Sequence, residues 1–367
     1  MWIATVNNID WPSRRDLTTD QQKSELLALF DRMASLGLNA VFLQVRPSAD
    51  AIYASPDAPW SEYLTGTMGR APEPVYDPLE FAVAEAHRRG LQMHAWFNPF
   101  RARHSSGTSE IAMSHIATRR PDLVRTYGQQ RWLDPGDADA RREVIAAICD
   151  VVRRYDVDGV HMDDYFYPYP ELDGSGQKID FPDDVTWQSY RAGGGTLSRD
   201  DWRRDNINDF VRDLYESVKA IRPNTVVGIS PFGIWRPGHP EQIQGLDAYA
   251  ELYADSRLWL RRGWVDYLAP QLYWPIDRRE QSFTALLDWW LNQDWRGRGI
   301  VAGISVNRVA SGRPNSVSAE EIARQIAVLR DTDARGFILF SARSLMENRG
   351  GVNDAIVTAA SPSPRYP

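Results

Sequence analysis

Short apolar runs alternate along this chain with longer stretches in which apolar residues recur at helical spacing. The runs are nearly continuous and rich in β-branched and aromatic residues, which is typical of strands buried on both faces of a parallel sheet. The pattern predicts eight strands: Ile3–Val6, Ala40–Val45, Gln92–Phe97, Gly159–Met162, Val226–Ser230, Tyr267–Leu272, Val301–Val306 and Phe337–Ser341.

The stretches between the runs predict amphipathic helices, and most of these are followed by a glycine or an asparagine and then by a strand. The predicted helices are Asp20–Leu36, Pro78–Arg89, Ala138–Tyr155, Asp200–Ile221, Leu246–Arg262, Gln281–Gln293, Ala319–Arg330 and Ser344–Thr358. Regular alternation of this kind predicts an α/β protein in which eight β-α units close into a single (β/α)8 TIM barrel. An open doubly wound sheet is the alternative, but it usually carries a glycine-rich phosphate-binding turn, and no such motif occurs here.

Three connections are much longer than the others, namely Arg46–Asp77, Asn98–Asp137 and Asp163–Arg199. Each leaves the carboxyl end of a predicted strand, which is the face of a barrel where active sites lie. Long loops at that face are more often functional than disordered. We therefore predict one domain over residues 1–360 with its site among these loops, and a flexible Ser/Pro-rich tail over residues 361–367.

Composition excludes some partners and favours another. The formal net charge of −7 argues against a nucleic-acid partner, and no stretch has the roughly 18 apolar residues that span a membrane. The single cysteine, Cys149, allows no internal disulfide bond. The chain contains 14 tryptophans and 15 tyrosines, and a surplus of such side chains often marks surfaces that stack on sugar rings. A polysaccharide is therefore the expected partner.

The first candidate for chemistry is the adjacent pair Asp163 and Asp164, where the fourth predicted strand meets its loop. Neighbouring residues of a regular strand point to opposite faces, so both can reach the mouth only if the strand has ended there. Two close carboxylates resist ionising together, which leaves one as a general acid beside an ionised partner, as glycosidic cleavage requires. Capping or turn formation is the structural alternative. A metal site using His161 with Asp163 is weaker, because no second ligand cluster is evident.

The second candidate is the end of the sixth predicted strand. Gln271 and Tyr273 share a face there, and Trp274 follows them. Tyr273 can stabilise a developing charge and Trp274 can form the floor of a sugar site, although barrel packing is the preferred explanation for a single tyrosine taken alone. Further polar and aromatic residues at strand ends form a predicted substrate-binding set with Gln271 and Trp274: Gln44, Arg46, His94, Asn98, Arg101, His161, Tyr165, Trp235 and Asn307.

Each residue of this set, taken alone, can be explained as a buried polar group whose hydrogen bonds are satisfied. The informative feature is that all of them lie at strand ends. Arg46 and Arg101 offer guanidinium groups to a substrate carboxylate. The HExxH motif of zinc proteases and the GxSxG motif of serine hydrolases are both absent. No metal and no cofactor is therefore expected.

These residues lie in stretches that resemble the bacterial glycosyl-hydrolase-10-like family. The matching stretches cover nearly the whole chain: Trp2–Pro12, Asn39–Pro47, His94–Arg101, Asp158–Pro168, Gly228–Arg236 and Pro270–Pro275. The resemblance implies a (β/α)8 barrel and an exported or lipid-anchored protein. It also implies a glycosidase that cuts GlcNAc–MurNAc strands of peptidoglycan stripped of their peptides. The predicted core begins beside Met1, so we expect an extracytoplasmic protein whose export signal is absent from this sequence.

An Asp-Asp pair in this position also resembles β-N-acetylglucosaminidases that use the acetamido oxygen of the substrate as nucleophile. That likeness implies that Asp163 orients the acetamido group, Asp164 protonates the leaving oxygen and Tyr273 helps to hold the acetamido group. The sequence departs from the related chitinases, because Tyr165 stands where they have a glutamate. It also lacks the glutamates that family-10 xylanases carry at the ends of strands four and seven.

The leading hypothesis is thus a retaining, substrate-assisted glycosidase acting on N-acetylated cell-wall glycan, with the long loops favouring cleavage within chains. Two alternatives remain open. A direct-displacement glycosidase would pair Asp164 with a carboxylate such as Asp10, Glu241 or Asp277. A barrel that has lost catalysis would only bind glycan, and the fold alone does not separate it from an enzyme.

Overall fold

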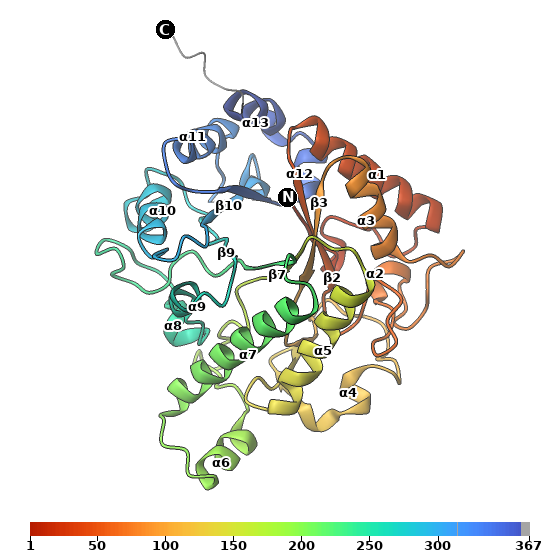
Figure 1. Cartoon of the computed structure of the whole chain (residues 1–367), viewed down its shortest axis with the longest axis vertical. Helices are drawn as coiled ribbons and strands as arrows, with labels where there is room; N and C mark the ends of the chain where they lie inside the picture. Colours follow the sequence, from red (N-terminus) through yellow and green to blue (C-terminus); the bar gives the residue numbers. More distant parts are fainter. Residues whose placement is uncertain (314, 361–367) are drawn as a thin grey trace.

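Parallel strands run through the middle of the molecule and helices surround them (Figure 1). The computed structural model describes residues 1–313 and 315–360, so the predicted tail lies outside the described residues. Six parallel strands form one sheet in the order β1-β2-β3-β7-β8-β9, and β10 pairs with β11. The bounds are β1 Trp2–Ile3, β2 Ala40–Arg46, β3 Gln92–Phe97, β7 Gly159–Met162, β8 Val226–Ile229, β9 Tyr267–Leu268, β10 Val301–Ser305 and β11 Gly336–Phe340.

Parallel bridges continue the array from β9 to β10, at Leu268 with Ile300 and at Gln271 with Gly303. The first and last strands meet through side chains, because the rings of Trp2 and Phe340 lie 6.3 Å apart. Within residues 1–313 and 315–360, no backbone ladder joins β11 to β1. The α/β class is confirmed, whereas closure into a hydrogen-bonded barrel stays a prediction.

Helices follow the strands as the periodicity predicts, and their ends carry the expected caps. Thr18 and Gln21 form a reciprocal capping box at the start of α1. Asp77 caps α3, whose first residue is Pro78. The larger helices are α1 Thr19–Ser35, α3 Pro78–Arg88, α5 Ala138–Arg154, α7 Arg199–Ile221, α9 Ser256–Arg262, α10 Phe283–Leu291, α11 Ala319–Leu329 and α13 Val352–Ala360. Among the described residues, no helix is both long and apolar enough to cross a membrane.

Two predicted helices are interrupted. The stretch predicted from Leu246 to Arg262 divides into α8 (Ala248–Glu251) and α9, because the Asp255 side chain accepts from the backbone of Leu258 and starts a new helix there. The last predicted helix likewise divides into α12 (Ala342–Met346), the 3-10 turn η5 (Arg349–Gly351) and α13. Its break is at Asn348, whose φ of 44° is left-handed and ends a right-handed helix.

Two predicted strands are shorter than expected. β1 ends at Ile3, and Val6–Asn8 form the 3-10 turn η1 instead of extending it. β9 ends at Leu268 because Pro270 has no N–H to donate to a ladder.

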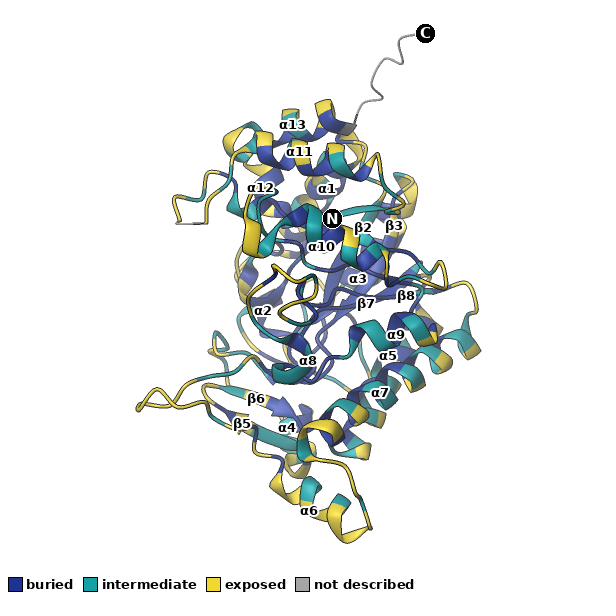
Figure 2. Cartoon of the chain, turned by 90° about the vertical axis from the view of Figure 1, so that its left-hand side faces the viewer, coloured by how far each residue is buried: buried dark blue, intermediate teal, exposed yellow. Residues whose placement is uncertain are grey.

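The three long connections carry structure of their own. The first contains α2 (Glu62–Thr65), and the third contains α6 (Asp184–Ala192). The second contains a small antiparallel sheet in the order β4-β6-β5, together with α4 and the 3-10 turn η2. Figure 2 shows β5, β6, α4 and α6 gathered at one end of the molecule. The bounds are β4 Arg101–Arg103, α4 Ile116–Arg119, η2 Pro121–Leu123, β5 Val124–Tyr127 and β6 Gln130–Leu133.

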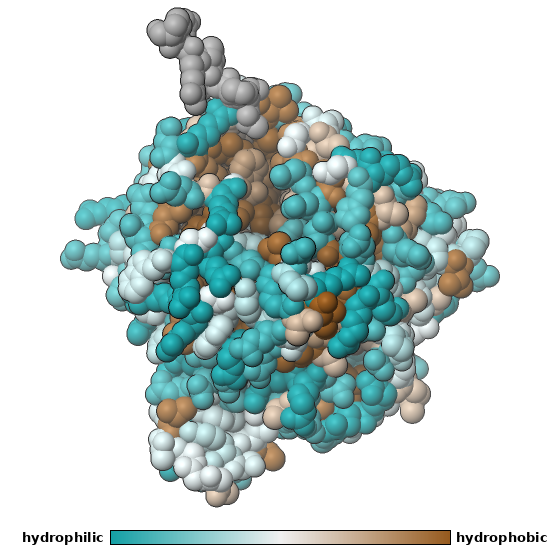
Figure 3. Space-filling view, in the orientation of Figure 1, coloured by the Kyte–Doolittle hydropathy of each residue, from teal (hydrophilic) through white to brown (hydrophobic). Residues whose placement is uncertain are grey.

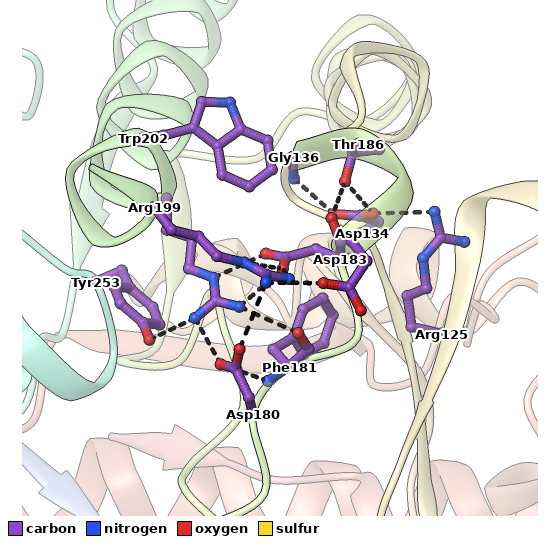
Figure 4. Close-up of polar contacts among 12 residues, drawn as sticks. Arg125, Asp134, Gly136, Asp180, Phe181, Asp183, Thr186, Arg199, Trp202 and Tyr253 are labelled. Atoms are coloured by element: carbon purple, nitrogen blue, oxygen red, sulfur yellow. Dashed lines mark hydrogen bonds and ion pairs between the residues drawn. The ribbon is translucent and has the colours of Figure 1, made fainter. Parts of the chain in front are cut away.

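A buried network of ion pairs fastens the third connection to α7 (Figure 4). Asp183 is fully buried and accepts hydrogen bonds from Arg199 and Arg203. Arg203 also donates to Asp180 and to the hydroxyl of Tyr253. Asp183 is the last residue of the segment between β7 and α6, and that segment begins with the candidate aspartates. The network therefore holds the end of the segment in place.

We expect Asp183→Ala to destabilise the fold by about 3–5 kcal/mol, because it leaves the buried Arg203 without its main partner. Asp184→Ala is the matched control, since Asp184 also pairs with Arg199 but has a side chain that is 70% exposed. An exposed pair contributes at most about 1 kcal/mol. Chemical unfolding of the two variants measures both effects, and equal losses of stability would show that the buried network does not hold the loops.

Candidate active site

Asp163 and Asp164 follow directly on Met162, the last residue of β7. The ladder has ended there, so the two side chains are no longer forced to opposite faces and both line one cavity of about 140 Å³. Both are buried. Four other predicted residues line the same cavity: Gln44, Tyr165, Gln271 and Tyr273. The structure thus brings together the residues to which the sequence assigned chemistry.

The remaining wall comes mainly from apolar side chains at the mouth. Trp2, Trp96 and Phe340 line it from β1, β3 and β11, and Ser230 lines it just after β8. The three aromatic residues were not predicted as site residues. Trp96 was open to prediction, because it lies on the same face of β3 as His94 and two residues nearer the mouth. Trp2 and Phe340 were not open to prediction in the same way, because they meet only where the first and last strands come together.

Asp163 has one satisfied oxygen and one free oxygen. Its Oδ2 accepts from Nδ2 of Asn98 at 2.5 Å and from Nε1 of Trp96 at 3.3 Å. Its Oδ1 is buried without a hydrogen-bond partner among the described residues. Burial and the neighbouring charge of Asp164 together raise the pKa of Asp163 to about 7. A free buried oxygen of this kind is ready to bind a donor on a ligand.

Asp164 accepts a hydrogen bond from the hydroxyl of Tyr169. Burial raises the pKa of Asp164, and the hydrogen bonds from Tyr169 and Gln271 only partly oppose this. Because both pKa values are raised, the two carboxyl groups retain a proton nearer to neutral pH than isolated aspartates do. The pair can therefore supply a general acid.

We expect kcat/KM to fall above about pH 7, by about tenfold per pH unit, as the aspartate pair loses the proton that the general acid must donate. The direction follows from the raised pKa, since the protonated pair persists below pH 7 and disappears above it. A pH profile of kcat/KM on a soluble glycan checks this expectation. A profile that stays flat to pH 9 would contradict a proton held by these aspartates.

Hydrogen bonds connect Asp163 to the loop after β1. Gln44 accepts from the backbone N–H groups of Thr5 and Val6 and donates to Oδ1 of Asn98, which in turn donates to Asp163. Gln44 and Asn98 therefore fix the orientation of the carboxylate. Asn98 therefore lies behind Asp163 and does not line the cavity.

Arg101 also acts from behind the wall. Its Nη1 donates to the Tyr165 hydroxyl at 2.9 Å, and its Nε donates to the backbone carbonyl of Pro47. Neither Arg101 nor Arg46 lines this cavity, so their pairing with a substrate carboxylate stays a prediction. A register shift between Gln44 and Arg46 turns the Arg46 side chain aside, where it is buried beside Tyr53.

His94 and His161 lie inside the strand array instead of at its mouth, which corrects their predicted place among the substrate-binding residues. His161 accepts from Nε1 of Trp2 at 3.0 Å, and its other ring nitrogen lies 2.7 Å from the hydroxyl of Tyr267. His94 lines a different cavity, around Met1 at the opposite end of the strands. Figure 3 shows a hydrophobic hollow at the position where Figure 1 marks the N-terminus, in a surface that is otherwise mostly hydrophilic.

Trp235 is likewise a packing residue. It stacks on Trp289 with ring centroids 5.7 Å apart, and its Nε1 donates to Asp255. It does not line the catalytic cavity. Asn307 lies at the same mouth but in a neighbouring cavity.

Three aromatic rings extend outward from Asp164. Tyr169 bonds Asp164, Phe232 lies 6.4 Å from Tyr169, and Trp274 lies 5.6 Å from Phe232. Trp274 is only partly buried. It thus lies outside the cavity but on a path that leads from it. Tyr169 and Phe232 were not predicted, and the run of aromatic residues after Asp164 was the signal for Tyr169.

The carboxylates predicted as alternative partners of Asp164 do not line the cavity. Asp10 is buried and saturated, because it accepts from the N–H of Ala4, the hydroxyl of Ser341 and the N–H of Arg343. Asp277 is 76% exposed and pairs with Arg324, and Glu241 is exposed. Across residues 1–313 and 315–360, no group of three or more His, Cys, Asp or Glu side chains is placed to hold a metal ion.

The chain is similar in sequence to bacterial proteins described as glycosyl hydrolases. The sequence pattern of the family "Glycosyl hydrolase-like 10" matches residues 1–319. Glycosyl hydrolase YngK of Bacillus subtilis (strain 168) is 40% identical over 368 residues, which cover 98% of this chain and 70% of that protein. Glycosyl hydrolase DigH of Escherichia coli (strain K12) is 35% identical over 310 residues, which cover 79% of this chain and 68% of that protein.

Solved structures share the fold at much lower sequence identity. The PgaB (BpsB) glycoside hydrolase domain from Bordetella bronchiseptica superposes with a TM-score of 0.60 at 18% identity, covering 95% of this chain and 96% of that one. Alpha-L-fucosidase isoenzyme 2 from Paenibacillus thiaminolyticus superposes with a TM-score of 0.53 at 12% identity, covering 91% of this chain and 45% of that one. At these identities the likeness concerns the fold alone.

Proposed function

Since the chain belongs to the glycosyl hydrolase-like 10 family, it is a glycoside hydrolase, and we propose that it cleaves N-acetylated cell-wall glycan with the acetamido group of the substrate as nucleophile. The proposed substrate is peptidoglycan strands without their peptides, cut within the chain outside the cytoplasm. The proposed scaffold is a closed (β/α)8 barrel, which the side-chain contact between β1 and β11 supports.

One observation carries the mechanism. Among the described residues that line the catalytic cavity, Asp163 and Asp164 are the only carboxylates, and they come from the same strand end. A direct-displacement glycosidase needs a carboxylate on each side of the scissile bond, about 5–5.5 Å apart for retention and about 6.5–9.5 Å apart for inversion. Since Asp10, Glu241 and Asp277 lie elsewhere, the substrate itself is the best source of the nucleophile.

In this mechanism the acetamido N–H donates to the free Oδ1 of Asp163, which favours the shared proton on Asp164. The acetamido oxygen attacks the anomeric carbon while the glycosidic carbon–oxygen bond breaks and Asp164 protonates the leaving oxygen. Water, deprotonated by Asp164, then opens the oxazoline ring. Two displacements at one carbon retain the anomeric configuration.

Tyr273 completes the site from the opposite wall. Burial raises the pKa of its hydroxyl well above the usual value, so the group stays protonated and can donate. Its ring stacks on Phe340 at 6.2 Å, and its backbone carbonyl accepts from Arg308. The hydroxyl therefore has a fixed position from which to hold the acetamido oxygen in line with the anomeric carbon.

Purified peptide-free glycan strands, incubated with the enzyme and analysed by mass spectrometry, test the proposed function. We expect shorter saccharides, and no products from the same strands after de-N-acetylation. Binding without cleavage would favour the barrel that has lost catalysis. Cleavage that persists after de-N-acetylation would favour direct displacement.

We expect Trp274→Ala to raise KM for the glycan more than it lowers thermal stability, because Trp274 is partly exposed beside Phe232. Trp290→Ala is the contrasting variant, since Trp290 is fully buried and donates to the carbonyl of Gly233. Truncation of a core tryptophan costs about 3–5 kcal/mol. KM and melting temperature measured on both variants separate the two roles, and a Trp274 variant that behaves like the Trp290 variant is a packing residue.

A further inference from the structure

A second cavity of about 290 Å³ opens at the same mouth, beside the catalytic one. Its lining comes from the turns that follow β1, β10 and β11, including Asn307, Ser344 and Arg349. Ile9 lines both cavities, so the two share a wall. When one sugar of a glycan lies over the aspartates, the next sugar of that glycan can therefore reach the second cavity.

The second cavity is rich in positive charge. Arg313, Arg343 and Arg349 line it, and no Asp or Glu is among its described lining residues. The closest acidic partner is Glu347, which pairs with Arg343 at 3.5 Å and with Arg349 at 2.5 Å. Three arginines against two carboxylates, those of Glu347 and Asp10, leave a local excess of positive charge in a chain whose formal net charge is −7.

Two groups in the cavity are held ready for a ligand. Arg349 is fixed by Glu347 and by the backbone carbonyl of Asn307, so its guanidinium has a set direction. The side chain of Ser344 is almost fully buried, and its hydroxyl has no hydrogen-bond partner among the described residues. A buried hydroxyl without a partner is costly unless a ligand or water completes it.

Asp10 offsets this charge only in part, because it supplies one negative charge against the three arginines. Its carboxylate lies beneath the cavity and is occupied by the hydroxyl of Ser341 and the N–H groups of Ala4 and Arg343. Asp10 instead ties the turn after β1 to the end of β11, which fixes the wall between the two cavities. The Arg343 side chain remains half exposed above it.

We propose that this arginine-lined cavity is a subsite for a carboxylate carried by the sugar next to the one in the catalytic cavity. Guanidinium groups bind carboxylates with charge-assisted and often bidentate hydrogen bonds. The enzyme then selects glycans that alternate N-acetylated sugars with acidic ones over neutral N-acetylated polymers. The proposal rests on the proposed function for the identity of the substrate as an N-acetylated glycan.

The test compares native glycan strands with strands whose carboxyl groups have been reduced to alcohols. Calorimetry with the Asp164→Asn enzyme measures affinity without turnover, and wild-type kcat/KM on both strands measures selectivity. We expect native strands to be favoured by at least about tenfold, the effect of one charge-assisted hydrogen bond. Arg343→Gln combined with Arg349→Gln should remove most of that preference.

Two further variants test whether the carboxylate binds in this cavity. Arg313→Gln changes an exposed side chain of the same cavity and should reduce the preference without affecting folding. Arg212→Gln is the control, because Arg212 pairs with Asp209 and Asp213 on the outer side of α7 and should leave the preference intact.

Equal affinity for native and reduced strands would overturn the proposed subsite. If the enzyme nevertheless cleaved both kinds of strand, the proposed function would still stand. A preference that survives all the cavity variants would place the carboxylate elsewhere. No binding and no cleavage of either strand would overturn the proposed function and the subsite together.

Discussion

Asp164→Asn should lower kcat by about 10²–10⁴-fold, which is the usual loss when a positioned general acid is removed. Asparagine keeps the shape of the side chain and a hydrogen bond with Tyr169, but it has no acidic proton to transfer to a leaving oxygen. The variant should fold and bind glycan, because burial already disfavours the charge that the substitution removes. Steady-state kinetics, calorimetry and thermal melting measure the three properties.

Asp134→Asn serves as the control for this prediction. Asp134 is also a fully buried aspartate with a pKa raised by burial, but it pairs with Arg125 and Thr186 in the loop network shown in Figure 4. Its substitution should lower stability and leave kcat close to the wild-type value. If Asp164→Asn instead loses stability and keeps its activity, Asp164 is a structural residue and another group is the acid.

The fold class was predictable because each strand is a short apolar run followed by a helix with a clear start and stop. The errors arose where a local feature overrides that pattern. Pro270 shortens β9, and the left-handed Asn348 divides the last helix. The contact between the β1 and β11 ends of the array joins residues more than 330 positions apart, such as Ser341 and Asp10, and no local pattern encodes it.

The candidate site was predictable as far as position along a strand decides it. Asp163 follows directly on β7, Gln271 and Tyr273 lie a few residues beyond the end of β9, and all three line one cavity. The sequence pattern did not show how deep within the strand array each side chain lies. His161 lies within β7, two residues before Asp163, and so belongs to a layer of side chains inside the array.

Arg46 was misplaced for a different reason. Counting residues along β2 puts it on the same side as Gln44, and the irregular register between the two breaks that count. The arginine-lined cavity was also beyond local patterns, because its residues follow three different strands. Asn307 was the only member predicted to bind substrate.

The most direct test of the aspartate pair as a substrate-assisted site is the affinity for a stable thiazoline analogue of the oxazoline ring. We expect it to bind at least about 10²-fold more tightly than the parent N-acetylated sugar, since an enzyme binds most tightly the species closest to its transition state. Asp163→Asn should reduce this preference, because the variant has no carboxylate to pair through the free Oδ1 with the ring nitrogen of the analogue. Equal affinity for thiazoline and parent sugar, together with a sugar ester trapped on an Asp or Glu by a fluorosugar, would contradict the substrate-assisted mechanism.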